Sequence, residues 1–367
     1  MLFRKDQGIK YGHWDIVFRG LSVLVILLAT TASSLSATPP KTVAEIALYQ
    51  GPDREKILIE GAKKEGQMTL YTSNSIVTNV LGPGFEKKYG VKVQIGRAES
   101  QELLKRVMEE YKAGRYTCDV IETSDAAMQI FHREGLFQEY FTPEAAFYDD
   151  AVKKKGKVGV YYLADREIHY GLGFNTEKVP SATAPKALKD LLDPRWKGKM
   201  SIVGSSTGVR WIGSLLDSMG RDYVEKLSRQ EIKVQDMTAA ALATLVASGE
   251  APISPTAGET NINAAKKKGA PVEWRPLEPT LTTTGLSGMT IKAPHPFAAV
   301  LFLDFIHSKE GQGLVINSQE NSPRTDIGAL EKSYKKDYID TRFPIDEYEK
   351  RFNEWEDILK NMFIRRR

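Results

Sequence analysis

Five short loops rich in hydroxyl and amide side chains are the parts of this chain best suited to bind a ligand. Each follows a predicted strand and precedes a predicted helix. Taken singly, such a loop can be an ordinary helix cap. Five at the same end of successive strands exceed what capping requires, and hydroxyl groups at helix N-termini suit an anion or a polar group. The predicted ligand-binding residues in these loops are Ser73, Asn74, Ser100, Gln101, Thr123, Ser124, Ser205, Ser206, Thr207 and Thr256.

One of these loops also fits a hydrolase pattern. Residues 204–208 match G-x-S-x-G with Ser206 in the middle, after a predicted strand and before a predicted helix. A serine hydrolase would also need an acid and a histidine further along the chain. His295 lies between two prolines and His307 ends an apolar helix, so neither lies in a loop placed to receive a proton from Ser206. An anion-binding turn is favoured, and a secreted serine hydrolase is the alternative from another functional class.

Charged and metal-binding side chains add little further chemistry. Arg210, one turn into the helix after Gly208, is the best candidate for a charged clamp on the ligand, or else an exposed arginine at a helix start. The five histidines are spaced unlike metal ligands, so no metal site and no cofactor are predicted. Cys118 is the only cysteine, which excludes an intramolecular disulfide.

The elements that must position these loops alternate along the chain. Strand-like runs are separated by helix-like segments, for example the predicted strand 68–71 and the predicted helix 101–113, which carries apolar residues at spacings of three and four. This alternation predicts parallel strands with right-handed crossovers and therefore an α/β fold. The length of 367 residues suits two domains, and a net charge of +4 gives no reason to expect a nucleic-acid partner.

The N-terminus predicts export. Basic residues up to Arg19 precede an apolar run at 21–29 and a stretch of small residues ending at Ala37, the order of a secretory signal peptide over residues 1–37. An N-terminal anchor is disfavoured because the apolar run is far short of the ~20 residues that span a bilayer. No cysteine follows this run for lipid attachment, so a free periplasmic protein is expected.

Six motifs follow one another along the chain: Leu70–Asn74, Phe85–Gly90, Tyr170–Thr176, Asp193–Lys199, Gly269–Glu273 and Asn321–Asp326. In this order and spacing they resemble the family 1 extracellular solute-binding proteins of ABC transporters, and most closely their ferric-iron-binding branch. The resemblance extends over almost the whole chain from the signal peptide to about Asp326. It implies the type 2 periplasmic-binding-protein fold, in which two α/β lobes joined by two crossover strands close on a ligand in the cleft between them.

The resemblance also implies an organisation and a role. Residues 38–162 with 284–330 would form lobe 1, residues 163–283 lobe 2, and residues 331–367 a helical tail packed on lobe 2. The chain would be a monomer that captures a small polar or anionic solute, delivers it to a membrane permease and catalyses nothing. A receptor domain that presents its ligand to a sensor protein would use the same fold and site.

One departure from the family bears on the ligand. Iron-binding members carry two adjacent tyrosines after a strand of the second lobe, where this chain has Ser254–Asn261 without a tyrosine. A ferric ion prefers anionic oxygen ligands, and only Glu99, Glu122 and Glu259 offer them in these loops. A polar or oxyanionic solute is therefore expected, with ferric iron as the alternative.

Overall fold

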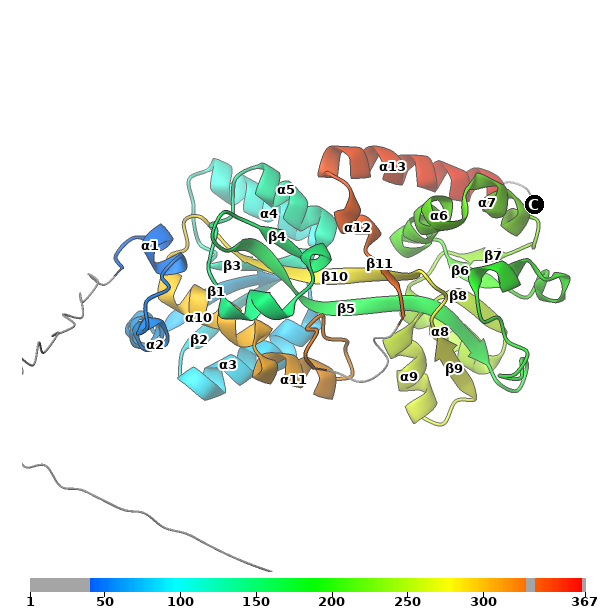
Figure 1. Cartoon of the computed structure of the whole chain (residues 1–367), viewed down its shortest axis with the longest axis horizontal. Coiled ribbons are helices and arrows are strands. Elements are labelled where there is room, and N and C mark those ends of the chain that lie inside the picture. Colours follow the sequence, from blue (N-terminus) through cyan, green and yellow to red (C-terminus); the bar gives the residue numbers. More distant parts are fainter. Residues whose placement is uncertain (1–39, 328–333, 365–367) are drawn as a thin grey trace, which may run out of the picture. The chain divides into compact units, whose positions relative to one another are not determined.

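Two long antiparallel strands, β5 (Val160–Asn175) and β10 (Thr280–Met289), pass side by side between two lobes in the computed structural model (Figure 1). The structure describes residues 40–327 and 334–364, so the predicted signal peptide lies outside it. Within these ranges the sheet has the strand order β2-β1-β3-β10-β5-β4, and β8, β9 and β11 pair with the two crossover strands. The predicted two-lobed α/β fold is confirmed.

Lobe 1 contains three neighbouring parallel strands, with β1 between β2 and β3, and β10 runs antiparallel beside β3. Helices cover both faces of this sheet, as expected for strands joined by helical crossovers (Figure 1). The strands are β1 (Gln67–Thr72), β2 (Lys92–Arg97), β3 (Val120–Ser124) and β4 (Lys153–Lys155). The helical segments are α1 (Val43–Ala47), α2 (Arg54–Glu65), η1 (Val77–Leu81), α3 (Gly82–Tyr89), α4 (Ser100–Lys112), α5 (Asp125–Arg133), η2 (Pro143–Phe147), η3 (Asp150–Val152), α10 (Pro296–His307) and α11 (Lys309–Asn317).

Lobe 2 is built around the far half of β5, which pairs with β8 and with β9. The parallel pair β6 and β7 continues this lobe, and a parallel bridge joins Met200 to Ile253 beside β8. The strands are β6 (Ser201–Val203), β7 (Lys233–Gln235), β8 (Ile253–Gly258) and β9 (Val272–Arg275). The helical segments are η4 (Leu188–Leu192), η5 (Pro194–Trp196), α6 (Ser206–Met219), α7 (Arg221–Ser228), α8 (Ala239–Ser248) and α9 (Glu259–Lys267). None of the helices in the described ranges is both long and apolar enough to span a bilayer.

Each lobe buries its own apolar core. One cluster joins residues of lobe 1, among them Phe85, Phe131 and Phe302, and a second joins residues of lobe 2, among them Phe174 and Trp211. A smaller third cluster lies under α8 and α9. Separate cores allow each lobe to stay packed while the two crossover strands between them bend.

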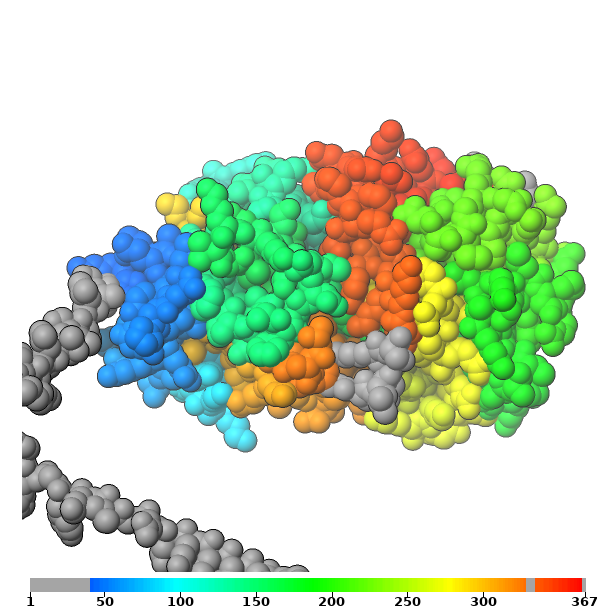
Figure 2. All heavy atoms as spheres, in the orientation of Figure 1, coloured from blue at the N-terminus to red at the C-terminus, as the bar shows by residue number. Residues whose placement is uncertain are grey.

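The C-terminal segment adds a third connection between the lobes. It comprises β11 (Lys336–Asp337), α12 (Ile339–Arg342), α13 (Ile345–Ile358) and η7 (Leu359–Ile364), and its apolar side chains join the lobe 2 core. Gln129 of α5 donates to the carbonyl of Asp340, and Arg133 pairs with Asp346, so the segment also contacts lobe 1. In Figure 2 these residues, orange to red, lie on the surface between the two lobes.

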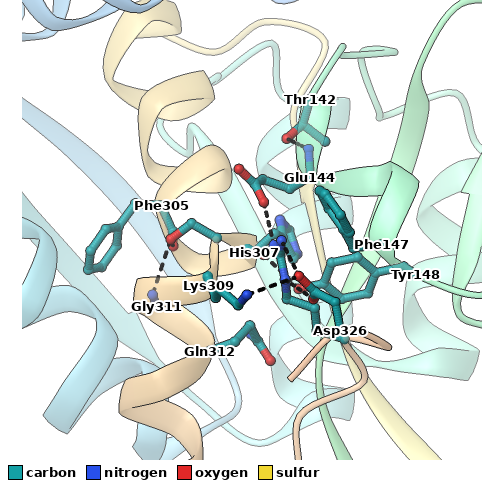
Figure 3. Close-up of polar contacts among 12 residues, drawn as sticks. Thr142, Glu144, Phe147, Tyr148, Phe305, His307, Lys309, Gly311, Gln312 and Asp326 are labelled. Atoms are coloured by element: carbon teal, nitrogen blue, oxygen red, sulfur yellow. Dashed lines mark hydrogen bonds and ion pairs between the residues drawn. The ribbon is translucent and has the colours of Figure 1, made fainter. Parts of the chain in front are cut away.

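The return from α11 is fixed by a buried arginine. Arg324 forms ion pairs with Glu144 and Asp326 and donates to the carbonyl of His307. Lys309 lies 3.6 Å from Asp326, and Tyr148 meets the His307 ring edge-on (Figure 3). These contacts hold residues 321–326 in lobe 1, so that Asn321 forms a bridge with Glu167 on β5.

Trp355 should be a major source of stability for lobe 2. Its indole is 3% exposed and lies against Gly213, where any side chain would collide with the ring. We expect Trp355→Ala to lower the free energy of unfolding in urea by about 3–5 kcal/mol, because a large buried side chain leaves a cavity. Ile364→Ala, at an exposed position of the same segment, is the control and should cost about 0.5 kcal/mol or less. Equal effects of the two substitutions would contradict the packing described here.

Candidate functional site

Three predicted site residues meet at the carboxyl ends of the lobe 1 strands. Thr123 at the end of β3 donates from Oγ1 to Ser100 Oγ at 3.0 Å, and Ser73 Oγ lies 3.0 Å from Thr123 Oγ1. Because Thr123 has given its only hydroxyl proton to Ser100, Ser73 must donate to Thr123. The hydroxyl proton of Ser100 then has no acceptor within the described residues, which makes Ser100 a donor available to a ligand.

Asn74 presents a second donor beside this cluster. Its backbone N–H donates to Thr72 Oγ1 at 2.9 Å, and its side-chain oxygen accepts from the N–H of Ile76 at 3.0 Å. These bonds fix the turn after β1 and orient the amide group. The Nδ2 group is buried and has no hydrogen-bond partner among the described residues. A buried donor without an acceptor costs about 1–3 kcal/mol, so this amide is a second unused donor at the sheet edge.

An ion pair lies on the other face of the same sheet edge. Glu122 precedes Thr123 on β3 and therefore points to the opposite face, where Arg166 of β5 lies 3.6 Å from Glu122 Oε1. Arg166 reaches Glu122 across Gly285, because a Cβ there would stand 2.9 Å from both groups. Glu122 Oε2 accepts from the Thr72 hydroxyl. Burial raises the pKa of Glu122, and the charge of Arg166 opposes that rise.

The remaining predicted residues of lobe 1 flank these groups. Ser124 pairs in register with Gly285, which itself pairs with Arg166, so all three lie abreast across the sheet. Ser124 is also the N-cap position of α5 but makes no side-chain cap bond. Gln101 is exposed in the first turn of α4.

The lobe 2 loops are divided between surface and core. Ser205 and Ser206 are exposed at the start of α6, and Ser205 makes no side-chain cap bond. Thr207 is buried in the first turn of that helix. Thr256 is fully buried, and its hydroxyl accepts from the N–H of Val203 at 3.2 Å. Thr256 therefore braces β6 against β8 inside lobe 2.

Arg210, the predicted clamp, already has a partner. Its Nε donates to Asp340 of α12 at 2.7 Å, and Tyr348 also donates to Asp340, at 2.7 Å. The opposing charge of Asp340 outweighs the effect of burial and raises the pKa of Arg210. Arg210 therefore links α6 to the C-terminal segment, because its side chain points to α12, where Asp340 balances its charge.

The residues of a serine hydrolase do not assemble around Ser206. His295 binds Asp119 through Nδ1 at 2.9 Å, and His307 is buried against Ser287 and the carbonyl of Leu303. Both histidines belong to lobe 1, whereas Ser206 begins a lobe 2 helix. Within the described ranges no histidine lies in hydrogen-bond contact with Ser206, so the alternative from the G-x-S-x-G pattern lacks its proton acceptor.

A buried charged cluster covers the other side of β5. His169 Nδ1 and Nε2 lie 2.8 Å from Glu259 and Glu167, respectively. Lys336 and Tyr338 donate to Glu167, both at 2.5 Å. Although burial favours the protonated acid, the hydrogen bond from His169 and the charge of Lys336 lower the pKa of Glu167 to about 2. The cluster joins β5, α9 and the C-terminal segment.

A cavity of about 870 Å³ borders this cluster between the lobes. Glu259, Trp274 and Lys266 line it from lobe 2, and Ile316 and Asn321 line it from lobe 1. Residues 166 and 169 are an odd number apart on β5, so His169 and Arg166 point to opposite faces of that strand. None of the predicted site residues lines the cavity.

The three glutamates considered as iron ligands do not converge. Glu122 faces Arg166, Glu259 faces His169, and Glu99 is exposed at the start of α4. Among the residues that the structure describes, no group of three or more His, Cys, Asp or Glu side chains is arranged to hold a metal ion.

Sequence reasoning missed Arg166 and the Glu167–His169 pair. The available signal was the charged triplet Asp165–Glu167 inside an otherwise apolar strand, since charges are buried in a strand only when they are paired or functional. Asp340 was missed as well, because its partner Arg210 lies 130 positions away.

The pKa values of two buried histidines should be shifted in opposite directions. Burial lowers the pKa of His307 to about 4, whereas the hydrogen bonds that the His169 ring makes to Glu167 and Glu259 outweigh burial and raise the pKa of His169 above 6.5. The contribution of His169 to the free energy of unfolding is therefore present below pH 6.5. It is lost as the pH rises through the pKa of the ring in the folded protein. Stability from His307 is present above pH 6.5 and lost as the pH falls toward 4.

Ring ¹⁵N NMR of the labelled protein, assigned with His169→Gln and His307→Gln, measures both titrations. We expect the pKa of the His169 ring to lie above that of an ordinary histidine and the His307 ring to remain neutral at pH 5. Titration of the two rings together near pH 6.5 would show that neither environment is as described.

Both the sequence and the fold of this chain resemble those of known proteins. Residues 75–317 match the model of the family described as bacterial extracellular solute-binding protein. The structure is similar to iron-bound HitA of Pseudomonas aeruginosa, with a TM-score of 0.63 and 20% identity over 79% of this chain and 99% of that one. A search of curated protein sequences gives no match.

Two further solved structures extend the comparison. FutA (IdiA) of Trichodesmium with iron and citrate has a TM-score of 0.66 and 18% identity, covering 81% of this chain and 99% of that one. AfuA of Actinobacillus pleuropneumoniae with fructose 6-phosphate has a TM-score of 0.61 and 23% identity, covering 80% of this chain and 99% of that one. At these identities the likeness establishes a shared fold.

Proposed function

This chain belongs to the bacterial extracellular solute-binding proteins, and on that basis we propose that it captures a small polar or anionic solute between its lobes. The solute would bind at the carboxyl ends of β1, β2 and β3 in lobe 1 and be enclosed when the crossover strands bend. In open α/β sheets ligands bind at this edge, where the helix N-termini point.

The observation that carries the proposal is the pair of unused donors at this edge. The hydroxyl proton of Ser100 and the buried Nδ2 group of Asn74 have no acceptor among the described residues. Both donors are held in place by other bonds to their own side chains, so they are already oriented before a ligand binds. Donors of this kind select a solute rich in oxygen acceptors.

Lobe 2 supplies a complementary surface. Ser205 and Ser206 expose hydroxyl groups at the N-terminus of α6, whose unpaired backbone N–H groups and dipole favour a negative group. Known proteins of the same fold bind ligands of this chemistry, since AfuA holds fructose 6-phosphate and FutA holds citrate with iron. This range makes a polar organic anion a reasonable first class to test.

The family also supplies the wider role. Extracellular solute-binding proteins imply a partner permease of an ABC importer and a location outside the cytoplasmic membrane. We extend this to a periplasmic protein that delivers its solute to the permease as a monomer. A receptor that hands the same solute to a sensor protein differs only in its partner, so co-purification with a permease rather than a sensor would decide between these roles.

A test of solute capture begins with the purified protein in a bacterial metabolite extract. Native mass spectrometry should detect one small molecule per chain, and the same solute should raise the melting temperature. Asn74→Ala should weaken affinity roughly tenfold by removing a buried donor, whereas Asn79→Ala, exposed on η1, should leave affinity unchanged.

The outcomes separate the rival functions. Recovery of no solute from any extract would refute solute capture, and equal affinity of Asn74→Ala and Asn79→Ala would move the site away from this sheet edge. Tight binding of ferric ion alone, without an organic anion, would favour the iron alternative. Labelling of Ser206 by a serine-reactive phosphonate would favour the hydrolase.

A further inference from the structure

We infer that Arg166 recognises the solute, and that the solute carries an oxyanion, a carboxylate or a phosphate, which accepts hydrogen bonds from its guanidinium group. This inference rests on the proposed solute capture and names the chemical class of the solute. Arg166 lies on β5 where that strand leaves lobe 1, abreast of Gly285 and Ser124 at the carboxyl end of β3.

The guanidinium group of Arg166 is unusual because its donors are unused. The side chain is only 14% exposed, yet no hydrogen bond joins it to another described residue, and its Nε is buried without a partner. Its contact with Glu122, at 3.6 Å, is too long for a hydrogen bond. Glu122 therefore balances the charge of Arg166, while the N–H donors of the guanidinium group remain available to a ligand.

Other largely buried arginines of this chain differ in this respect. Arg54 donates to Asp304 at 2.5 Å, Arg210 donates to Asp340 at 2.7 Å, and Arg324 donates to Asp326 at 2.5 Å. Each of these side chains ties two segments together through direct bonds. Arg166 alone among these four makes no such bond, which is expected of a residue whose acceptor arrives from outside.

Gly285 creates the space that the guanidinium group occupies. An ideal Cβ at this position would stand 2.9 Å from Arg166 Cζ and 2.9 Å from Glu122 Oε1. A side chain on β10 would therefore displace the arginine from the sheet edge. Gly285 thus places the charge on the crossover strands, where a bound anion would contact the element that bends when the lobes close.

The acids around Arg166 make binding depend on pH. Glu122, Asp165 and Glu320 interact electrostatically with it, and burial raises the pKa of each while the charge of Arg166 opposes the rise. An oxyanion would replace Glu122 as the partner of Arg166 and favour protonation of that carboxylate. Binding should therefore take up protons, and affinity should rise as the pH is lowered.

Calorimetric titration tests the inference with inorganic phosphate, glucose 6-phosphate, succinate, citrate, neutral glucose and cationic putrescine. We expect binding only among the anions, with proton uptake shown by the dependence of the heat on the buffer. The phosphates and the carboxylates in this panel distinguish the two kinds of oxyanion. The net charge of the solute recovered from the metabolite extract answers the same question independently.

Three variants assign the role to Arg166. For the bound anion, Arg166→Met should weaken affinity roughly 30-fold or more, and Arg166→Lys should weaken it roughly tenfold because a lysine cannot form the forked pair. Gly285→Ala should resemble Arg166→Met. Arg221→Met, which removes an exposed charge paired with Glu225 on α7, is the control and should bind normally. Melting temperatures without solute identify any variant that fails to fold.

Two results would overturn the inference while leaving solute capture intact. One is an anion that binds Arg166→Met or Arg166→Lys as tightly as the unmodified protein. The other is recovery of a neutral or cationic solute from the extract, whose binding is insensitive to Arg166. Failure to recover any solute would instead refute the proposed function, and this inference with it.

Discussion

The antiparallel pairing of β5 with β10 is the constraint on which the rest of the structure depends. Seven residue pairs, from Leu281–Tyr170 to Ser287–Leu163, run through the boundary between the lobes. β10 pairs with β3 of lobe 1 and β5 pairs with β8 and β9 of lobe 2, so neither lobe can move without bending this shared ribbon. A change in the relative position of the lobes therefore alters the surroundings of side chains on this ribbon. Charged side chains lie on both of its faces.

The two faces of the ribbon are chemically different. On one face the polar side-chain atoms of Glu167 and His169 are all bonded, to each other, to α9 or to the C-terminal segment. Such a saturated network stabilises a single arrangement. On the other face Arg166 and Glu122 each keep a buried atom without a partner. Unused groups cost stability in the protein alone, so the second face is where bound solute can supply the compensating bonds.

The sequence allowed the local elements to be predicted but not their distant partners. The helix expected at 101–113 is α4, Ser100–Lys112, because its apolar spacing and the glycine after it are local signals. The meeting of Ser73, Ser100 and Thr123 also followed from the strand order of a parallel sheet. By contrast, the start of β5 at Val160 is not evident from the local pattern, because Asp165, Arg166 and Glu167 interrupt the apolar residues of the strand. Glu122 and Lys336, which make those charges tolerable, are too far away in sequence to be recognised.

The arrangement of acceptors and donors bears on which ligand is proposed. A hard cation requires several anionic oxygens pointing to one place, whereas Glu99, Glu122 and Glu259 are directed to three different surroundings. The unused groups at the sheet edge include donors from Ser100, Asn74 and Arg166. Since a donor is satisfied only by an acceptor, this edge is complementary to an oxygen-rich anion. A cation could use it only as part of a complex whose anionic component faces the protein.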